Sequence, residues 1–489
     1  MAPGSASSEL DELSRNSYQQ ELDRSLHPLR SLIMGVASCG PIGSVFAYVP
    51  ALLFICGMFS WWAMVIAAVL CIFQGLAYAE VGSAYPVAGG EYSMVARVLG
   101  KWLGVITFGL MSAMYIFVPT AAALAAGGIL GVIWPWAGTH THIIAVLVIV
   151  YAASVSFLKV KLGTWVAAFF VAVQIIALLV VTILGLVHWH SPSERLFSTQ
   201  ALGANGDMTT VTLAAAVVGI TVAFFIYQGF GNVIIFSEET KKAKSKIGGA
   251  AMGATITAIV VILVPTTALL LGAPSVHMLL TSASPLADTI ASWGGNFFGK
   301  VISFIIFLAI LDLATASMMA FTRVYWSGGR DNVWPTPVSK ALAYVNPTLK
   351  TPWVAVIGFA TICAVFGAVS NVASIVTFTG VITLSYAGLM GLSAIVIRLK
   401  KSPPERYKMP LWPIPPALLV IACVVMGTQQ EKRDLWITLA IAAAFLVYYL
   451  VYLRPRPEHW RLLDPIVEDV DMTYLGAPQT EDPAATVAT

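Results

Sequence analysis

One acidic residue, Asp312, stands in the middle of a long apolar stretch, "FLAILDLATASMMAFTR" (307–323). Along a helix it would lie about 16 Å from Arg323, which ends that stretch, and so well inside a hydrocarbon layer. A carboxylate at that depth is costly unless it is paired, protonated or in contact with water. We interpret Asp312 as a proton-coupling group, as a counter-charge for an amine or a sodium ion, or as a hydrogen-bond acceptor that joins two helices.

A second polar side chain, Gln174, stands alone in the apolar stretch "FFVAVQIIALL" (169–179). An amide does not titrate, so Gln174 cannot carry a proton itself. If a proton is carried, Asp312 is the better candidate. Gln174 is then either a part of the coupling site or an amide whose hydrogen bonds are satisfied between helices.

Two apolar segments are interrupted in their middle, at "MGVASCGPIGSVF" (34–46) and at "YQGFGN" (227–232). An unwound turn exposes N–H and C=O groups that lipid cannot satisfy, so a ligand, water or neighbouring protein must do so. The half-helix that follows offers the positive end of its dipole to a carboxylate. Glycines that only allow close helix packing are the alternative explanation. The predicted ligand contacts are Ser38, Gly40 and Gly43 in the first interruption and Tyr227, Gln228, Gly229 and Asn232 in the second.

Composition indicates that membrane helices position these residues. Of the 489 residues, 58% are hydrophobic and 10% are charged, whereas a soluble chain has about a quarter charged residues. The apolar runs are continuous, which argues against a transmembrane β-barrel.

The five cysteines include no CxxC pair, so we expect neither a disulfide framework nor a structural metal. No HExxH or GxSxG motif lies on a predicted span, and no basic patch suggests nucleic acid. We therefore expect no enzyme, no cofactor and no nucleic-acid partner.

The apolar runs predict about twelve transmembrane helices. They cover approximately residues 31–52, 55–80, 100–132, 142–158, 164–188, 211–236, 247–273, 297–325, 352–371, 374–398, 411–428 and 434–453. The interruptions fall in the first and sixth runs, which suggests two five-helix repeats, and paired interruptions of this kind point to a transporter site. The expected units are a tail (1–30), the two repeats (31–188 and 211–398), two extra helices (411–453) and a partly disordered tail (454–489).

The positive charges predict how the chain is oriented. Twelve spans place both termini on one side of the membrane. Of the 27 Lys and Arg residues, only Arg195, Lys300, Lys432 and Arg433 would then lie on the other side. By the positive-inside rule, we expect both termini in the cytoplasm and the protein in the plasma membrane.

Several motifs resemble those of the amino acid–polyamine–organocation transporter superfamily. "AEVGSAYPVAGGEY" (79–92) is similar to the signature after its second helix, and "FTRVYWSGGRDNVWP" (321–335) to the pattern after its eighth. "GFGNVIIFSEETKKAKSKIGGA" (229–250) and "FTGVITLSYAGLMGLSAIVIR" (378–398) resemble the end of its sixth helix and its tenth. The likeness covers about residues 30–450. It implies a five-plus-five inverted-repeat fold, alternating access, and amino acids or related amines as cargo.

The resemblance also implies roles for single residues. Phe225 matches the aromatic residue that closes over the substrate from outside. Asp312 lies on the stretch that supplies hydroxyls to a sodium site in sodium-coupled relatives, and Gln174 resembles a position that holds a lysine in some proton-coupled relatives. The sequence departs from the family pattern in "GPIGS" (40–44), and at Gly231, where relatives often carry a glutamate.

Charged residues at the ends of the predicted helices are candidates for an inner gate. They are Glu80, Glu91, Arg97, Glu238, Glu239 and Arg323. These residues either form ion pairs that break when the cavity opens inward or are solvated helix ends. Glu80 and Arg323 are the preferred gate residues, together with Phe225 on the outer side. Tyr115 is expected either to pack on the substrate or to belong to the core.

Together these features predict a secondary active transporter of amino acids or related compounds in a lipid bilayer, coupled to protons in preference to sodium. The alternatives are a polyamine- or choline-type amine transporter and an amino acid exchanger. Because no acid falls among the contacts predicted in the two interruptions, a neutral substrate is favoured over a dicationic one.

Overall fold

The computed structural model describes residues 17–18, 22, 24–189, 192–203, 207–282, 285–370, 372–400, 407–457, 459–462 and 464–465. Most of the predicted tails, residues 1–30 and 454–489, lies outside these residues. The chain forms two units. In one, β1 (Ser17–Tyr18) pairs in parallel with β4 (Asp464–Pro465). The other, from Leu22 to Leu462, contains the helices.

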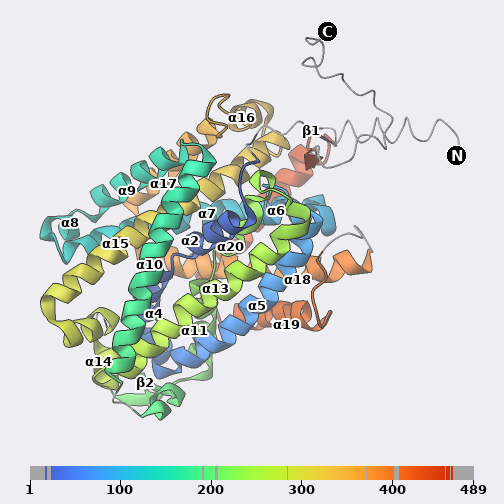
Figure 1. Ribbon diagram of the computed structural model, residues 1–489. Coiled ribbons are helices and arrows are strands. Elements are labelled where there is room, and N and C mark those ends of the chain that lie inside the picture. The colour runs from blue at the N-terminus through green and yellow to red at the C-terminus, as the bar shows by residue number, and fades with distance from the viewer. Residues whose placement is uncertain are drawn as a thin grey trace, which may run out of the picture. The chain divides into compact units, whose positions relative to one another are not determined.

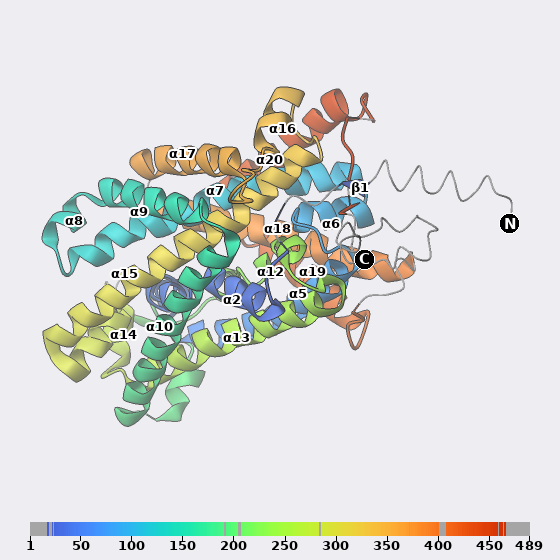
Figure 2. The same ribbon diagram turned by 45° about the horizontal axis from the view of Figure 1, so that its top comes forward.

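The larger unit is a bundle of helices (Figures 1 and 2). The helices before the central hairpin are α2 (Pro28–Cys39), α3 (Pro41–Gly43), α4 (Val49–Cys56), α5 (Ser60–Ala84), α6 (Glu91–Val98), α7 (Lys101–Gly131), α8 (Pro135–Thr139), α9 (Thr141–Ser156) and α10 (Val160–Val187). The antiparallel hairpin is β2 (Gln200–Leu202) and β3 (Met208–Thr210). The helices after it are α11 (Leu213–Ile226), α12 (Asn232–Ile235), α13 (Ala243–Gly272), α14 (Val276–Thr281), α15 (Pro285–Arg330), α16 (Thr336–Leu342), α17 (Trp353–Val369), α18 (Val372–Leu399), α19 (Ile414–Gly427) and α20 (Lys432–Tyr448).

Seven helical stretches in the described part of the chain are long and apolar enough to cross a membrane. They are Pro28–Ala84, Lys101–Gly131, Val160–Val187, Ala243–Gly272, Phe297–Arg330, Phe378–Leu399 and Lys432–Leu453. Four shorter helices, α9, α11, α17 and α19, are apolar as well. Each predicted span coincides with one of these stretches, the first of which covers two. The prediction of an all-α, polytopic membrane protein is therefore confirmed.

Small residues bring the helices close together. A Cβ atom on Gly75 of α5 would lie 2.6 Å from Oγ1 of Thr255 in α13. One on Gly185 of α10 would lie 2.6 Å from the carbonyl oxygen of Ala268, also in α13. Helices in lipid associate through such close van der Waals contacts, because lipid tails leave no hydrophobic driving force between them. As a result α13 packs against both α5 and α10, as Figure 1 shows.

The chain leaves the helical conformation at a glycine in both segments where the sequence predicts an interruption, and α15 has a further kink at Gly295. α2 ends at Cys39, Gly40 adopts a left-handed φ of 53°, and α3 follows. A π-helical turn, Ser44–Tyr48, then leads into α4. α11 ends at Ile226, and Gly229 has a φ of 121° in the turn before α12. A positive φ is open to glycine at little cost, which explains why the chain can turn at these two places.

The two interruptions meet backbone to backbone. A Cβ atom on Gly229 would lie 2.5 Å from the carbonyl carbon and oxygen of Ser38 and 2.6 Å from the amide nitrogen of Cys39. The Cys39 thiol also donates to the carbonyl oxygen of Tyr227 at 3.6 Å, which links the same two turns. Any side chain at position 229 would therefore push the two segments apart.

We expect Gly229→Ala to lower the free energy of unfolding by roughly 3 kcal/mol, because its methyl group meets backbone atoms at a strained φ. Thermal unfolding of the purified full-length protein in detergent measures this loss as a lower Tm. Gly249→Ala is the matched control. Gly249 is exposed in α13, and a Cβ atom added there would have no atom within 4 Å, so its Tm should stay the same or rise. Equal Tm values for wild type and Gly229→Ala would contradict the close approach.

Candidate functional site

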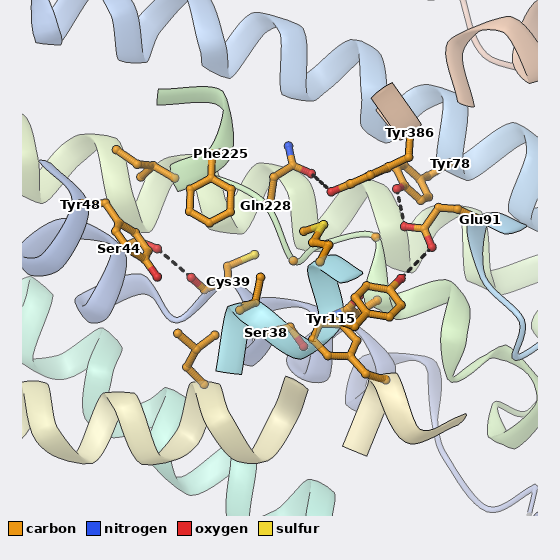
Figure 3. Close-up of a pocket in the computed structure, with 18 residues that line it drawn as sticks. Ser38, Cys39, Ser44, Tyr48, Tyr78, Glu91, Tyr115, Phe225, Gln228 and Tyr386 are labelled. Atoms are coloured by element: carbon orange, nitrogen blue, oxygen red, sulfur yellow. Dashed lines mark hydrogen bonds between the residues drawn. The ribbon is translucent and has the colours of Figure 1, made fainter. Parts of the chain in front are cut away.

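A pocket lies where the two interruptions meet (Figure 3). The space between its walls, open solvent included, is about 550 Å³. The predicted contacts that line it are Ser38, Tyr115, Phe225, Gln228, Gly229 and Asn232. The predicted contacts outside its lining are Gly40, Gly43 and Tyr227. A Cβ on Gly40 would instead face Leu313 at 3.1 Å, and Tyr227 is fully buried.

Two aromatic rings lie together at one end of the pocket. Phe225, near the end of α11, meets Tyr48 edge to face, with ring centroids 5.4 Å apart and an interplanar angle of 62°. Both rings line the pocket, and Figure 3 shows them away from Glu91. One ring comes from each interrupted segment, so this contact joins the two segments on that side of the pocket.

Both the nitrogen and the oxygen of the Gln228 side chain form hydrogen bonds within the protein. Its Nε2 donates to Oε1 of Gln74 at 3.0 Å and to the carbonyl oxygen of Phe224 at 3.1 Å. Its Oε1 accepts from Gln74 and from the Tyr386 hydroxyl, each at 3.3 Å. The bond to Phe224 satisfies a carbonyl near the end of α11, where helical partners run out. Gln228 therefore holds the turn in place and connects it to α18.

A carboxyl group, Glu91, lies at the opposite end of the pocket in Figure 3. It is the first residue of α6. Its Oε1 accepts from the Tyr78 hydroxyl at 2.6 Å and its Oε2 from the Tyr115 hydroxyl at 3.0 Å. Burial raises the pKa of this carboxyl, and the hydrogen bonds from the two tyrosines act in the opposite direction. Glu91 was expected either at an inner gate or at a solvated helix end, and it lies in the wall of the pocket, outside the two interruptions. The preference for a neutral substrate considered only the contacts in those interruptions, none of which is an acid.

Asp312 and Gln174, the two residues considered for the coupling site, are hydrogen-bonded to each other. Nε2 of Gln174 donates to Oδ2 of Asp312 at 2.7 Å, and its Oε1 accepts from the backbone N–H of Ile42 at 3.3 Å. Asp312 is fully buried, and its Oδ1 has no hydrogen-bond partner among the described residues. Neither side chain lines the pocket, although Leu313 does. One amide thus connects a buried carboxyl to the first interruption.

The two preferred gate residues at the helix ends belong to separate ion pairs. Arg323 donates to both carboxylate oxygens of Glu239, from Nε to Oε2 at 2.5 Å and from Nη2 to Oε1 at 3.0 Å. Glu80 pairs with Arg398, whose Nε lies 2.6 Å from Oε1. All of these side chains except that of Arg398 are fully buried. The first pair joins α15 to the segment after α12, and the second joins α5 to α18.

A second charged cluster surrounds Arg330. Its guanidinium contacts Glu238 and Asp331, each at 2.9 Å, and the Tyr92 hydroxyl donates to Oδ2 of Asp331 at 2.9 Å. Sequence reasoning named Glu238 but not Arg330 or Asp331, although both stand in the "GRDNVWP" (329–335) part of a motif it quoted. Arg97, another gate candidate, donates to Ser93 within its own helix.

Sequence reasoning also missed several residues of the pocket wall. Tyr48, Tyr78 and Tyr386 line it and come from three separate elements. Aromatic residues are common in membrane helices, and nothing in the spacing of these three sets them apart. Only Glu91 carried a usable signal, because it is an acid within the Gly-Gly-x-Tyr motif.

Comparison with known proteins places the chain among transporters. The family model described as amino acid permease matches residues 26–452. The branched-chain amino acid permease BcaP of Bacillus subtilis (strain 168) is 26% identical over 412 residues, which cover 80% of this chain and 83% of that protein. The serine/threonine exchanger SteT of the same organism is 23% identical over 404 residues, 80% of this chain and 87% of SteT. The b(0,+)-type amino acid transporter 1 of Homo sapiens is 23% identical over 433 residues, 85% of each chain. Since the family model spans most of the sequence, as the resemblance in its motifs predicted, this chain belongs to the amino acid permease family.

Proposed function

We propose that this chain is a secondary active transporter that moves amino acids or related compounds across the plasma membrane by alternating access, in symport with protons. The pocket enclosed by the two interrupted segments is the observation that carries the proposal. We propose further that these segments are the first and sixth of twelve spans in a five-plus-five inverted repeat. Both termini then lie in the cytoplasm, in line with the distribution of positive charge.

In this proposal the interruptions hold the amino acid backbone of the substrate. Helix ends leave N–H and C=O groups without helical partners, which suit a carboxylate and an amine. Ser38, Gly229 and Asn232 line the pocket at these ends. Phe225 covers the site from the outer side. Two of the relatives are named for branched-chain amino acids and for serine and threonine, which supports this class of substrate.

The coupling site in this proposal is Asp312. An ionised carboxylate without a cation is costly when buried, and protonation removes that cost. Gln174 joins Asp312 to the N–H of Ile42, so the hydrogen bonds at the first interruption respond to the protonation state of the carboxyl. A proton that binds one arrangement of the interruption more tightly than the other shifts the equilibrium between them, as coupling requires.

We expect Asp312→Asn to abolish accumulation driven by a pH gradient, because an amide of similar shape cannot take up a proton. A thermal-shift screen of amino acids and amines first identifies the cargo, since a ligand at 100 times its Kd adds about 2.7 kcal/mol to stability. Uptake of that cargo into proteoliposomes, with and without an imposed gradient, is then compared. Asp288→Asn is the control, because Asp288 is exposed and lies in α15 on the other side of the kink at Gly295.

Three outcomes would contradict parts of this proposal. If the Asp312→Asn protein still concentrates cargo against the gradient, coupling lies elsewhere. If wild-type protein needs internal cargo and ignores the gradient, it is an exchanger, as the printed name of one relative states for that protein. If neither an amino acid nor an amine raises the Tm, amino acid transport is wrong.

We also propose that the Arg323–Glu239 ion pair keeps the inner side of the pocket closed. The pair is buried and bidentate, so it resists separation of α15 from the segment after α12. Removing one partner alone would leave an uncompensated buried charge. The informative variant is therefore the double substitution Arg323→Gln/Glu239→Gln, which removes both charges together.

The double variant should make the pocket more accessible. Cys39 lines the pocket, and replacing the other four cysteines with alanine leaves it as the single thiol. We expect Arg323→Gln/Glu239→Gln to raise the rate at which a maleimide alkylates Cys39, because the inner side opens more often. Arg454→Gln, at an exposed arginine, is the control. A lower Tm with an unchanged alkylation rate would mean that the pair is structural only.

A further inference from the structure

The pocket wall contains one carboxyl group that neither the coupling site nor the gate uses. Among the described residues that line the pocket, Glu91 alone has an acidic side chain, and none is a lysine, an arginine or a histidine. Glu91 is only 5% exposed, so water screens its charge weakly. The pocket thus has an acid of its own and no cation of its own.

The partners of Glu91 differ from those of other buried acids. Glu239, for example, is bound by Arg323. Within the described part of the chain, the Glu91 carboxyl accepts the hydroxyls of Tyr78 and Tyr115 and a hydrogen bond from its own backbone N–H, and no lysine or arginine binds it. A carboxylate offers about four lone-pair sites, so about one remains for a further donor. A cation is the donor that best offsets the cost of burying this charge.

Ring contacts hold the carboxylate in position. The ring of Tyr115 stacks on Phe321, with centroids 3.7 Å apart and planes 8° from parallel. Tyr78 meets Phe230 edge to face at 6.0 Å. The two hydroxyls therefore fix both oxygens of Glu91. A preorganised acceptor of this kind loses little side-chain freedom when a ligand binds, which favours affinity.

The pocket has chemically different ends. In Figure 3, Glu91 lies at one end and the rings of Phe225 and Tyr48 lie at the other. Apolar side chains, including Met114 and Leu313, also line the pocket. We propose that Glu91 is an anionic subsite for a cationic nitrogen at the far end of the transported molecule, which is then a dibasic amino acid or a diamine. This inference rests on the proposed transport function and specifies its substrate class.

The competing arrangement has a neutral, protonated Glu91. In that arrangement Glu91 only joins α6 to α5 and α7, through Tyr78 and Tyr115. In that case a terminal ammonium group would be a costly buried charge, and the pocket would prefer an apolar side chain. Lysine and norleucine distinguish the two arrangements, because norleucine has the carbon chain of lysine without its terminal nitrogen.

Calorimetric titration of the purified full-length protein at pH 7 with lysine, norleucine and putrescine tests the proposal. We expect wild-type protein to bind lysine about tenfold more tightly than norleucine, as one charge-assisted hydrogen bond provides. Glu91→Gln should remove that preference and leave the affinity for norleucine unchanged, because glutamine keeps the shape and one acceptor oxygen. The ratio measured on the wild type needs no variant, so the test holds even if Glu91→Gln fails to fold.

Two further variants serve as controls. Asp434 is another buried acid, 5% exposed and outside the lining of the pocket. Asp434→Asn removes the same charge and should keep the preference for lysine, which separates a local contact from a general electrostatic effect. Glu91→Asp keeps the charge on a shorter side chain and should keep part of the preference.

The outcomes separate the subsite from the transport function. The subsite is overturned, and amino acid transport stands, if wild-type protein binds norleucine or other neutral amino acids at least as tightly as lysine. A preference for lysine that persists in Glu91→Gln also overturns the subsite. Binding of putrescine without any amino acid supports the subsite and overturns amino acid transport. If no common amino acid and no diamine binds, both are overturned.

Discussion

The contact between Gly229 and the backbone of Ser38 and Cys39 is the constraint on which the site depends. A Cβ atom at position 229 would lie only 2.5 Å from the Ser38 carbonyl, so the two interrupted segments touch with no side chain between them. Phe225 and Gln228 precede this contact along the chain, so the contact fixes where the Phe225 ring and the hydrogen bonds of Gln228 lie. Any change that opens the pocket has to move one backbone against the other.

Three buried carboxyl groups, those of Glu239, Asp312 and Glu91, have different kinds of hydrogen-bond partner. Glu239 is neutralised by an arginine that belongs to another segment, which makes the pair a tie between elements. One oxygen of Asp312 accepts from an amide, and the other has no hydrogen-bond partner among the described residues. These contacts do not supply a positive charge that would hold the carboxyl ionised. Glu91 has two tyrosine donors and faces the pocket. The first joins two elements, whereas the other two carboxyl groups have no cationic partner among the described residues, which is why the proposals concern them.

Much of the fold could be predicted because lipid imposes strong rules on sequence. A long apolar run has to be a helix, so the spans were visible, and glycines inside a run marked both interruptions. Asp312 was visible for the same reason, as an acid at membrane depth. The walls of the pocket were less predictable. Tyr48 and Tyr386 come from distant parts of the chain, and an aromatic residue in a membrane helix has the same local sequence whether it faces lipid, core or cavity.

Local sequence was enough to establish the all-helical membrane architecture, and it predicted interruptions at residues 34–46 and 227–232 and an Asp312 at membrane depth. These follow from the free energy of each segment in lipid, which depends on local composition. The groups that meet one another became known only from the packed fold: Gln174 bridges Asp312 and Ile42, Glu80 pairs with Arg398, and Glu91 faces the pocket. Such pairings depend on how the helices are rotated and packed against one another, because the register of two distant helices is set by contacts along their whole length.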